Sequence, residues 1–161
     1  MTVFMNEKDT FSEAFTKYAD TVYRVAYHNT SDSTDAEDIT QEVFLKLLKT
    51  PRPFKDSEHL KAWLIRVTIN LCRDVARKKR FSLLSDVIIK DEDSDEENSV
   101  LEAVMSLPEN YRNAIYLHYY EGYTAKETGK ILGAKENTVL SWLSRGREAL
   151  RKDLTGGFKD E

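Results

Sequence analysis

The sequence is poor in cysteine, proline and glycine: it has one, three and six of them in 161 residues. A single cysteine, Cys72, excludes an internal disulfide, and we expect it to be a small core residue. Scarce helix breakers, with common Ala, Leu, Glu, Lys and Arg, favour helices. We find no convincing strand and no internal repeat, so the sequence predicts an all-α protein.

Several features of other protein classes are also missing. No apolar run approaches the roughly 20 residues that span a bilayer, and the N-terminus has no signal pattern, which predicts a cytoplasmic protein without membrane insertion. The three histidines, His28, His59 and His118, are far apart and none has metal-ligand spacing. There is no GxxxxGK[ST] phosphate-binding loop. We therefore expect no metal, no cofactor and no enzymatic activity.

Charge is unevenly distributed along the chain, although the net charge is only −4. Residues 51–81 carry 9 basic and 3 acidic side chains, whereas residues 82–110 carry 1 and 9. Residues 111–152 carry 8 basic and 4 acidic side chains. Two basic blocks separated by an acidic one suggest two surfaces that face DNA, because phosphate binding depends on local charge.

Periodic apolar residues and capping signals divide the chain into two small helical domains joined by an acidic linker. Capping boxes at Thr10–Glu13 and Thr34–Glu37 predict two helix starts, and a third helix is expected from about Ser57 to Phe81. Pro51 and Pro53 end the second helix. These three helices form the first predicted domain, residues 1–81.

The segment 82–98 is acidic and reads as a flexible linker, although Val87–Ile89 within it are apolar. The second predicted domain, residues 99–161, starts with a capping box at Ser99. A further helix is expected from Pro108 to a C-terminal cap at Gly122.

Residues 124–147 have the spacing of a helix-turn-helix. Thr124 caps a short helix, Gly129 is small where two helices must cross, and Gly133 supplies the turn. The second helix, from about Glu136 to Leu154, would enter the major groove. Its polar side offers side chains to bases or phosphates; an ordinary helical hairpin with a solvated face is the alternative. These side chains are Asn137, Thr138, Ser141, Ser144, Arg145 and Arg147.

A second polar surface lies on the third helix. A stripe of side chains spaced by four, three, four and three residues can follow a phosphate backbone, or can simply be a solvated cationic face. The loop before this helix carries Phe54, Lys55 and Ser57, and such aromatic and polar groups can hold an unpaired base. Phe54 could equally be a core residue. The stripe consists of Arg66, Asn70, Arg73, Arg77 and Arg80.

Taken together, three stretches resemble the extracytoplasmic-function (ECF) group of bacterial sigma factors. They are DAEDITQEVFLKLL at 35–48, WLIRVTINLCRDVARKKR at 63–80, and LPENYRNAIYLHYYEGYTAKETGKILGAKENTVLSWLSRGREAL at 107–150. The resemblance implies an RNA polymerase sigma factor that binds core polymerase and directs it to promoters. It also implies promoter DNA as a ligand and an anti-sigma factor as a partner.

The resemblance further implies roles for individual positions. Asp38, Gln41, Glu42 and Leu45 would contact the clamp-helix coiled coil of the largest polymerase subunit, although without the resemblance Asp38 and Glu42 are ordinary exposed helix residues. The loop Phe54–His59 and the stripe match the part that captures and holds the opening minus-ten element. The last helix matches the reader of the minus-thirty-five element.

Leu140 and Trp142 depart from the family, which often has basic residues there. Burial of Trp142 is as reasonable as DNA contact. The competing hypothesis for the whole chain is a stand-alone helix-turn-helix transcription regulator, which would bind a palindromic site without polymerase.

Overall fold

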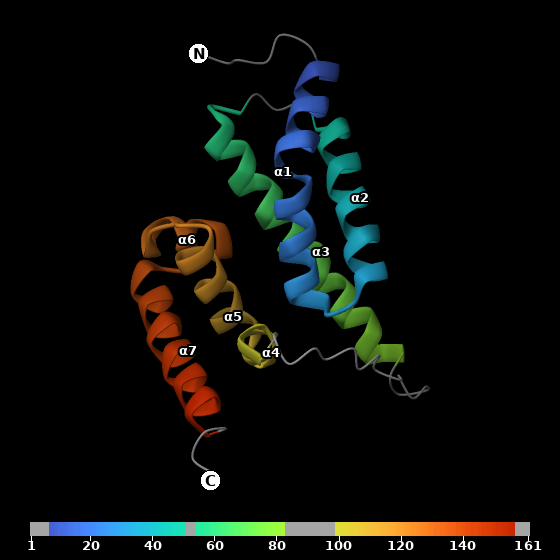
Figure 1. Cartoon of the computed structure of the whole chain (residues 1–161). Helices are drawn as coiled ribbons and strands as arrows, with labels where there is room; N and C mark the ends of the chain where they lie inside the picture. Colours follow the sequence, from blue (N-terminus) through green and yellow to red (C-terminus); the bar gives the residue numbers. More distant parts are fainter. Residues whose placement is uncertain (1–6, 51–53, 83–98, 157–161) are drawn as a thin grey trace. The chain divides into compact units, whose positions relative to one another are not determined.

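The computed structural model describes residues 7–50, 54–82 and 99–156, and within these ranges it contains helices and no strand (Figure 1). The helices divide into two compact units, α1 to α3 and α4 to α7. The predicted all-α fold is confirmed. Residues 83–98, which hold most of the predicted linker and Val87–Ile89, lie outside the described residues, so the domain boundaries stay predictions.

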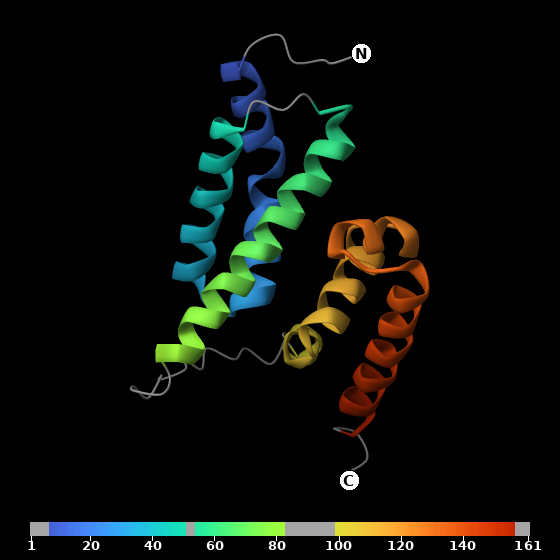
Figure 2. The same ribbon diagram turned by 180° about the vertical axis from the view of Figure 1, so that it is seen from behind.

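The first unit is a three-helix arrangement of α1 (Glu7–Thr30), α2 (Ser33–Lys49) and α3 (Ser57–Ser82), which lie side by side in both views (Figures 1 and 2). Each helix contributes one apolar face to a shared core, and Cys72 is buried in it as expected. Residues from all three helices contribute to this core, including Val22, Ala26, Ile39, Val43, Phe44 and Leu64.

The connection between α1 and α2 differs from the sequence prediction. Asp32 is the N-cap of α2, where its carboxylate accepts a 2.9 Å hydrogen bond from the Asp35 N–H, so the predicted cap at Thr34 is wrong. Ser31 takes a positive φ of 56°, which turns the chain sharply between the helices. Helix α1 begins at Glu7, which places the predicted cap Thr10 inside the helix.

The second unit contains α4 (Ser99–Ser106), α5 (Glu109–Ile115), the π-helical turn η2 (Tyr116–Tyr120), α6 (Ala125–Leu132) and α7 (Glu136–Gly156). The sequence predicts one regular helix up to Gly122, but the helix widens at η2, where the Glu121 N–H donates to the Tyr116 carbonyl oxygen at 3.1 Å. The core of this unit includes Leu107, Ala114, Ile115, Val139 and Leu143.

The helix-turn-helix prediction is confirmed in geometry by α6, a tight turn and α7. Thr124 and Glu127 form a reciprocal capping box, with hydrogen bonds of 3.0 and 3.1 Å. Gly133 ends α6 in the left-handed region at φ 73°. A Cβ on Gly129 would lie 2.4 Å from the Ala134 carbonyl oxygen, so the turn can approach α6 only where no side chain is present.

We therefore expect Gly129→Ala to destabilise the second unit by about 1–3 kcal/mol, the usual cost of overpacking. The colliding atom belongs to the backbone, so no side-chain rotation relieves the contact. Hydrogen exchange of the α5 to α7 amides in the full chain measures this loss. Lys130→Ala, at the next and exposed position, is the control and should change the same free energy by less than about 0.5 kcal/mol.

The capping box should also give α6 a pH-dependent stability. Hydrogen bonds from the Thr124 backbone N–H and then its hydroxyl hold the pKa of the Glu127 carboxyl below its ordinary value. Because the folded pKa is the lower one, this stabilisation is present above the unfolded pKa and is lost as the pH falls through the folded pKa. The stability advantage of the wild type over Glu127→Gln, followed by amide exchange in α6, should thus shrink from about pH 6 to about pH 3. If the difference in stability between the wild type and Glu127→Gln stayed constant over this pH range, the lowered pKa of Glu127 would be contradicted.

Candidate nucleic-acid and partner interfaces

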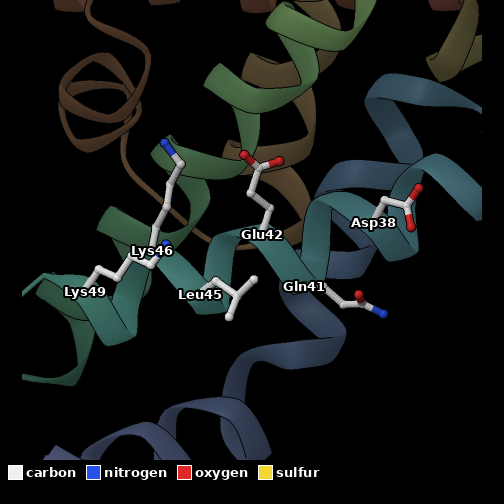
Figure 3. A pocket seen from close by; sticks show the side chains of 6 residues that line it. All are labelled: Asp38, Gln41, Glu42, Leu45, Lys46 and Lys49. Atoms are coloured by element: carbon white, nitrogen blue, oxygen red, sulfur yellow. The ribbon is translucent and has the colours of Figure 1, made fainter.

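The exposed side of α2 carries six residues that line a shallow surface hollow, here called the α2 strip. All six come from one helix and follow one another along it (Figure 3). The buried side of the same helix carries Ala36, Ile39, Val43, Phe44 and Leu47, which explains why the strip is left exposed. The strip consists of Asp38, Gln41, Glu42, Leu45, Lys46 and Lys49.

The α2 strip therefore brings together the four residues that the resemblance implied as polymerase contacts. It also adds Lys46 and Lys49, which the sequence interpretation missed although their spacing from Glu42 by four and seven residues places them on the same face. Leu45 is 52% exposed in the middle of the strip. Leu45 therefore supplies apolar area between the charged ends of the strip.

The loop before α3 is organised by its own side chains. The Asp56 carboxylate accepts a 2.8 Å hydrogen bond from the His59 N–H, as an N-cap does at the start of a helix. The Lys55 N–H donates to Nδ1 of His59 at 3.1 Å. The sequence interpretation placed His59 at the end of this loop but missed its part in shaping the loop.

Phe54 is 2% exposed and belongs to the core of the first unit. Its ring centroid lies 5.6 Å from that of Trp63 and 5.4 Å from that of His59, both edge to face. Of the two roles considered for Phe54, the structure therefore shows the packing role, and its ring offers no free face on which a base could stack. Contact with a base stays a prediction; the other two predicted contacts of this segment, Lys55 in the loop and Ser57 at the start of α3, are exposed.

The stripe residues of α3 lie at the surface of the first unit. Arg66, Asn70, Arg77 and Arg80 are exposed and Arg73 is half-buried. Arg77 forms an ion pair with Asp74 at 3.4 Å, an exposed contact that a phosphate could exchange with. Lys79, which the sequence places beside the stripe, pairs instead with Asp35 of α2.

All six predicted DNA contacts of the last helix are exposed on α7, while Val139, Leu143 and Gly146 on its other side are buried. Leu140 is 49% exposed among them. Trp142 is half-buried and packs against the core of the second unit, so the structure shows the packing role for it.

Charged groups near the end of α7 are partly paired. The Glu148 carboxylate accepts hydrogen bonds of 2.7 and 3.3 Å from Arg151, and these bonds lower the pKa of Glu148 and raise that of Arg151. Arg147 instead donates to the hydroxyl of Tyr119. Both contacts are solvent-exposed and add little to stability.

The residues that the structure describes contain no group of three or more His, Cys, Asp or Glu side chains that could hold a metal ion. None of the described helices is long and apolar enough to cross a membrane. The surfaces with a distinct chemical character are therefore the α2 strip, the loop and stripe of α3, and the exposed side of α7.

Comparison with known proteins gives these surfaces a family context. Residues 14–82 match the family model of Sigma-70 region 2, and residues 97–150 match that of Sigma-70, region 4. The match of the first unit to region 2 supports the sigma-factor hypothesis over the stand-alone regulator, which uses only the helix-turn-helix.

Similar curated proteins cover nearly the whole chain. The ECF RNA polymerase sigma factor SigM of Bacillus subtilis is 31% identical, over 94% of this chain and 99% of its own length. SigW of the same organism is 29% identical, over 92% of this chain and 90% of its own length.

A solved structure shares the fold: the sigma factor RpoE of Bartonella quintana, crystallised with the anti-sigma factor NepR, has a TM-score of 0.76 and 23% identity. The alignment covers 94% of this chain and 99% of that one. With both regions present in order and relatives matched end to end, the chain belongs to the ECF group of RNA polymerase sigma factors.

Proposed function

We propose that this chain binds core RNA polymerase and directs it to a defined set of promoters. The observation that carries the proposal is the presence, in one chain and in order, of a region 2 unit and a region 4 helix-turn-helix. The chain would act in the cytoplasm as a binding factor and not as an enzyme, since recognition and strand opening can draw on binding energy alone.

Within this proposal the α2 strip is the polymerase-binding surface. Its exposed Leu45 supplies apolar area, and its flanking charges supply orientation and speed of association. A competing protein that covered the strip would therefore block this surface of the helix.

The loop 54–59 and the α3 stripe would hold the opening minus-ten element. The cationic side chains among them would make this binding sensitive to salt. The contacts to phosphates and unpaired bases would come from Lys55, Ser57, Arg66, Asn70, Arg73, Arg77 and Arg80. The exposed side of α7 would read the minus-thirty-five element, with Asn137, Thr138, Ser141, Ser144 and Arg145 nearest the groove and Arg147 at its edge.

An anti-sigma factor is the proposed regulatory partner. The Bartonella RpoE structure contains the anti-sigma factor NepR, and a second similar structure, CnrH, contains the cytosolic domain of CnrY. A protein of this class that covered the α2 strip would prevent polymerase binding, because both would compete for Leu45 and its charged neighbours.

Run-off transcription with core polymerase on a genomic promoter library tests the proposed function. We expect transcripts that depend on the added chain and share two conserved elements at a fixed spacing. A pull-down with core polymerase provides the second measurement, and failure to retain core would overturn the proposal. Binding to a palindromic site without polymerase would instead favour a stand-alone regulator.

Reversing charge on the α2 strip should weaken polymerase binding selectively. We expect the double variant Asp38→Lys and Glu42→Lys to lower affinity for core at least about tenfold, because like charges at an interface cost more than a kilocalorie per mole. Competition binding against the wild type measures the effect. Glu37→Lys is the control for each single reversal: it changes the charge by +2, half of the change in the double variant, on the same helix at an exposed position outside the strip. Equal affinity of the double variant and the control would show that the strip is not the docking surface.

A further inference from the structure

Arg147 is held by a residue from a different part of the second unit. Its Nη1 donates a 2.8 Å hydrogen bond to the hydroxyl oxygen of Tyr119, which lies 28 positions earlier in the sequence. Tyr119 is 56% exposed, so this contact is at the surface and beside the side of α7 that we propose faces DNA. The sequence pattern singles out Arg147 but gives no role to Tyr119.

Tyr119 packs against a neighbouring side chain that is itself anchored to the backbone. Its ring packs edge to face against His118 at a centroid distance of 4.8 Å, and Nδ1 of His118 donates a 2.7 Å hydrogen bond to the Tyr123 carbonyl oxygen. Tyr119 also lies in η2, whose wider turn changes the direction in which side chains leave the helix. π-Helical turns of this kind often mark functional positions. The ring therefore has a defined place from which its hydroxyl can orient Arg147.

The chemistry of the contact preserves the charge of Arg147. The partner of Arg147 is a neutral hydroxyl, whereas nearby Arg151 is paired with the Glu148 carboxylate and so is partly neutralised. A guanidinium has five N–H donors, so donation of one from Nη1 leaves Nε and Nη2 available to a phosphate. Orienting the long side chain beforehand also reduces the conformational entropy that DNA binding would otherwise cost.

We propose that Tyr119 is a positioning residue for DNA binding, which holds the guanidinium of Arg147 toward a backbone phosphate of the minus-thirty-five element. This inference rests on the proposed function of α7. Phosphate contacts set register and carry no base information. The contribution of the Tyr119–Arg147 pair should therefore be similar on promoters that differ in base sequence.

The test uses holoenzyme reconstituted from the full chain and core polymerase, on promoters identified by run-off transcription. Tyr119→Phe removes only the hydroxyl, and we expect promoter affinity to fall about threefold to tenfold, the usual effect of one hydrogen bond. Tyr120→Phe is the matched control: it removes a hydroxyl from the adjacent exposed tyrosine, whose ring stacks on Tyr116 at 5.1 Å, and should leave affinity unchanged.

Three further measurements separate positioning from a general structural effect. Arg147→Ala should reduce the slope of log affinity against log salt by about one, as loss of one phosphate contact does. In the Arg147→Ala background, Tyr119→Phe should cause no additional loss. A neutral methylphosphonate placed in turn at each phosphate of the element should weaken wild-type binding more than Tyr119→Phe binding at one position, and should affect both equally at the others.

Full promoter affinity of Tyr119→Phe, or additive losses in the double variant, would overturn the positioning role. If Arg147→Ala keeps both affinity and salt slope while transcription proceeds normally, the pair has no role in DNA binding but the proposed function stands. If the wild-type chain neither binds core nor supports run-off transcription, the proposed function and this inference fail together.

Discussion

The close crossing of α6 and the following turn is the constraint on which the exposed surface of α7 depends. The Ala134 N–H donates a 2.8 Å hydrogen bond to the Gly129 carbonyl oxygen, and the missing side chain of Gly129 leaves room for the Ala134 carbonyl. Gly133 then reverses the chain at positive φ. Because these three backbone positions set where α7 begins and in which direction it runs, they also determine which of its side chains are exposed.

The same division of faces explains the first unit. Three helices share one core, so each has a single apolar face and an opposite face that is free for partners. On α2 the free face becomes the strip; on α3 it becomes the polar stripe. One packing arrangement thus produces two surfaces: an apolar and charged one suited to a protein, and a cationic one suited to a phosphate backbone. The packing of Phe54 against Trp63 joins the loop before α3 to the shared core.

Features that depend on neighbouring residues could be predicted from the sequence. The capping box of Thr124 and Glu127 and the turn at Gly133 involve only residues within one helical turn of each other, so residue type and spacing were sufficient. The exposed faces of α2 and α7 followed from apolar periodicity in the same way. The choice of Asp32 over Thr34 as a cap was less predictable, because both side chains are good caps and residue type alone does not decide between them.

Features that depend on distant contacts could not be predicted in this way. The ion pair of Lys79 with Asp35 and the hydrogen bond of Arg147 with Tyr119 join residues on different helices, and nothing in local spacing indicates them. The π-helical turn η2 escaped prediction because apolar periodicity assumes a regular 3.6-residue repeat. Burial of Phe54 is likewise a consequence of where α3 meets the rest of the core.

The order of charges along the α2 strip has a consequence for any protein that docks there. Carboxylates at Asp38 and Glu42 lie toward the start of the helix, and the ammonium groups of Lys46 and Lys49 lie toward its end, with Leu45 between them. A partner with a matching cationic and anionic end can pair with both only in one polarity, since turning it around would oppose like charges. The charge order along this one helix therefore specifies the orientation in which such a partner binds.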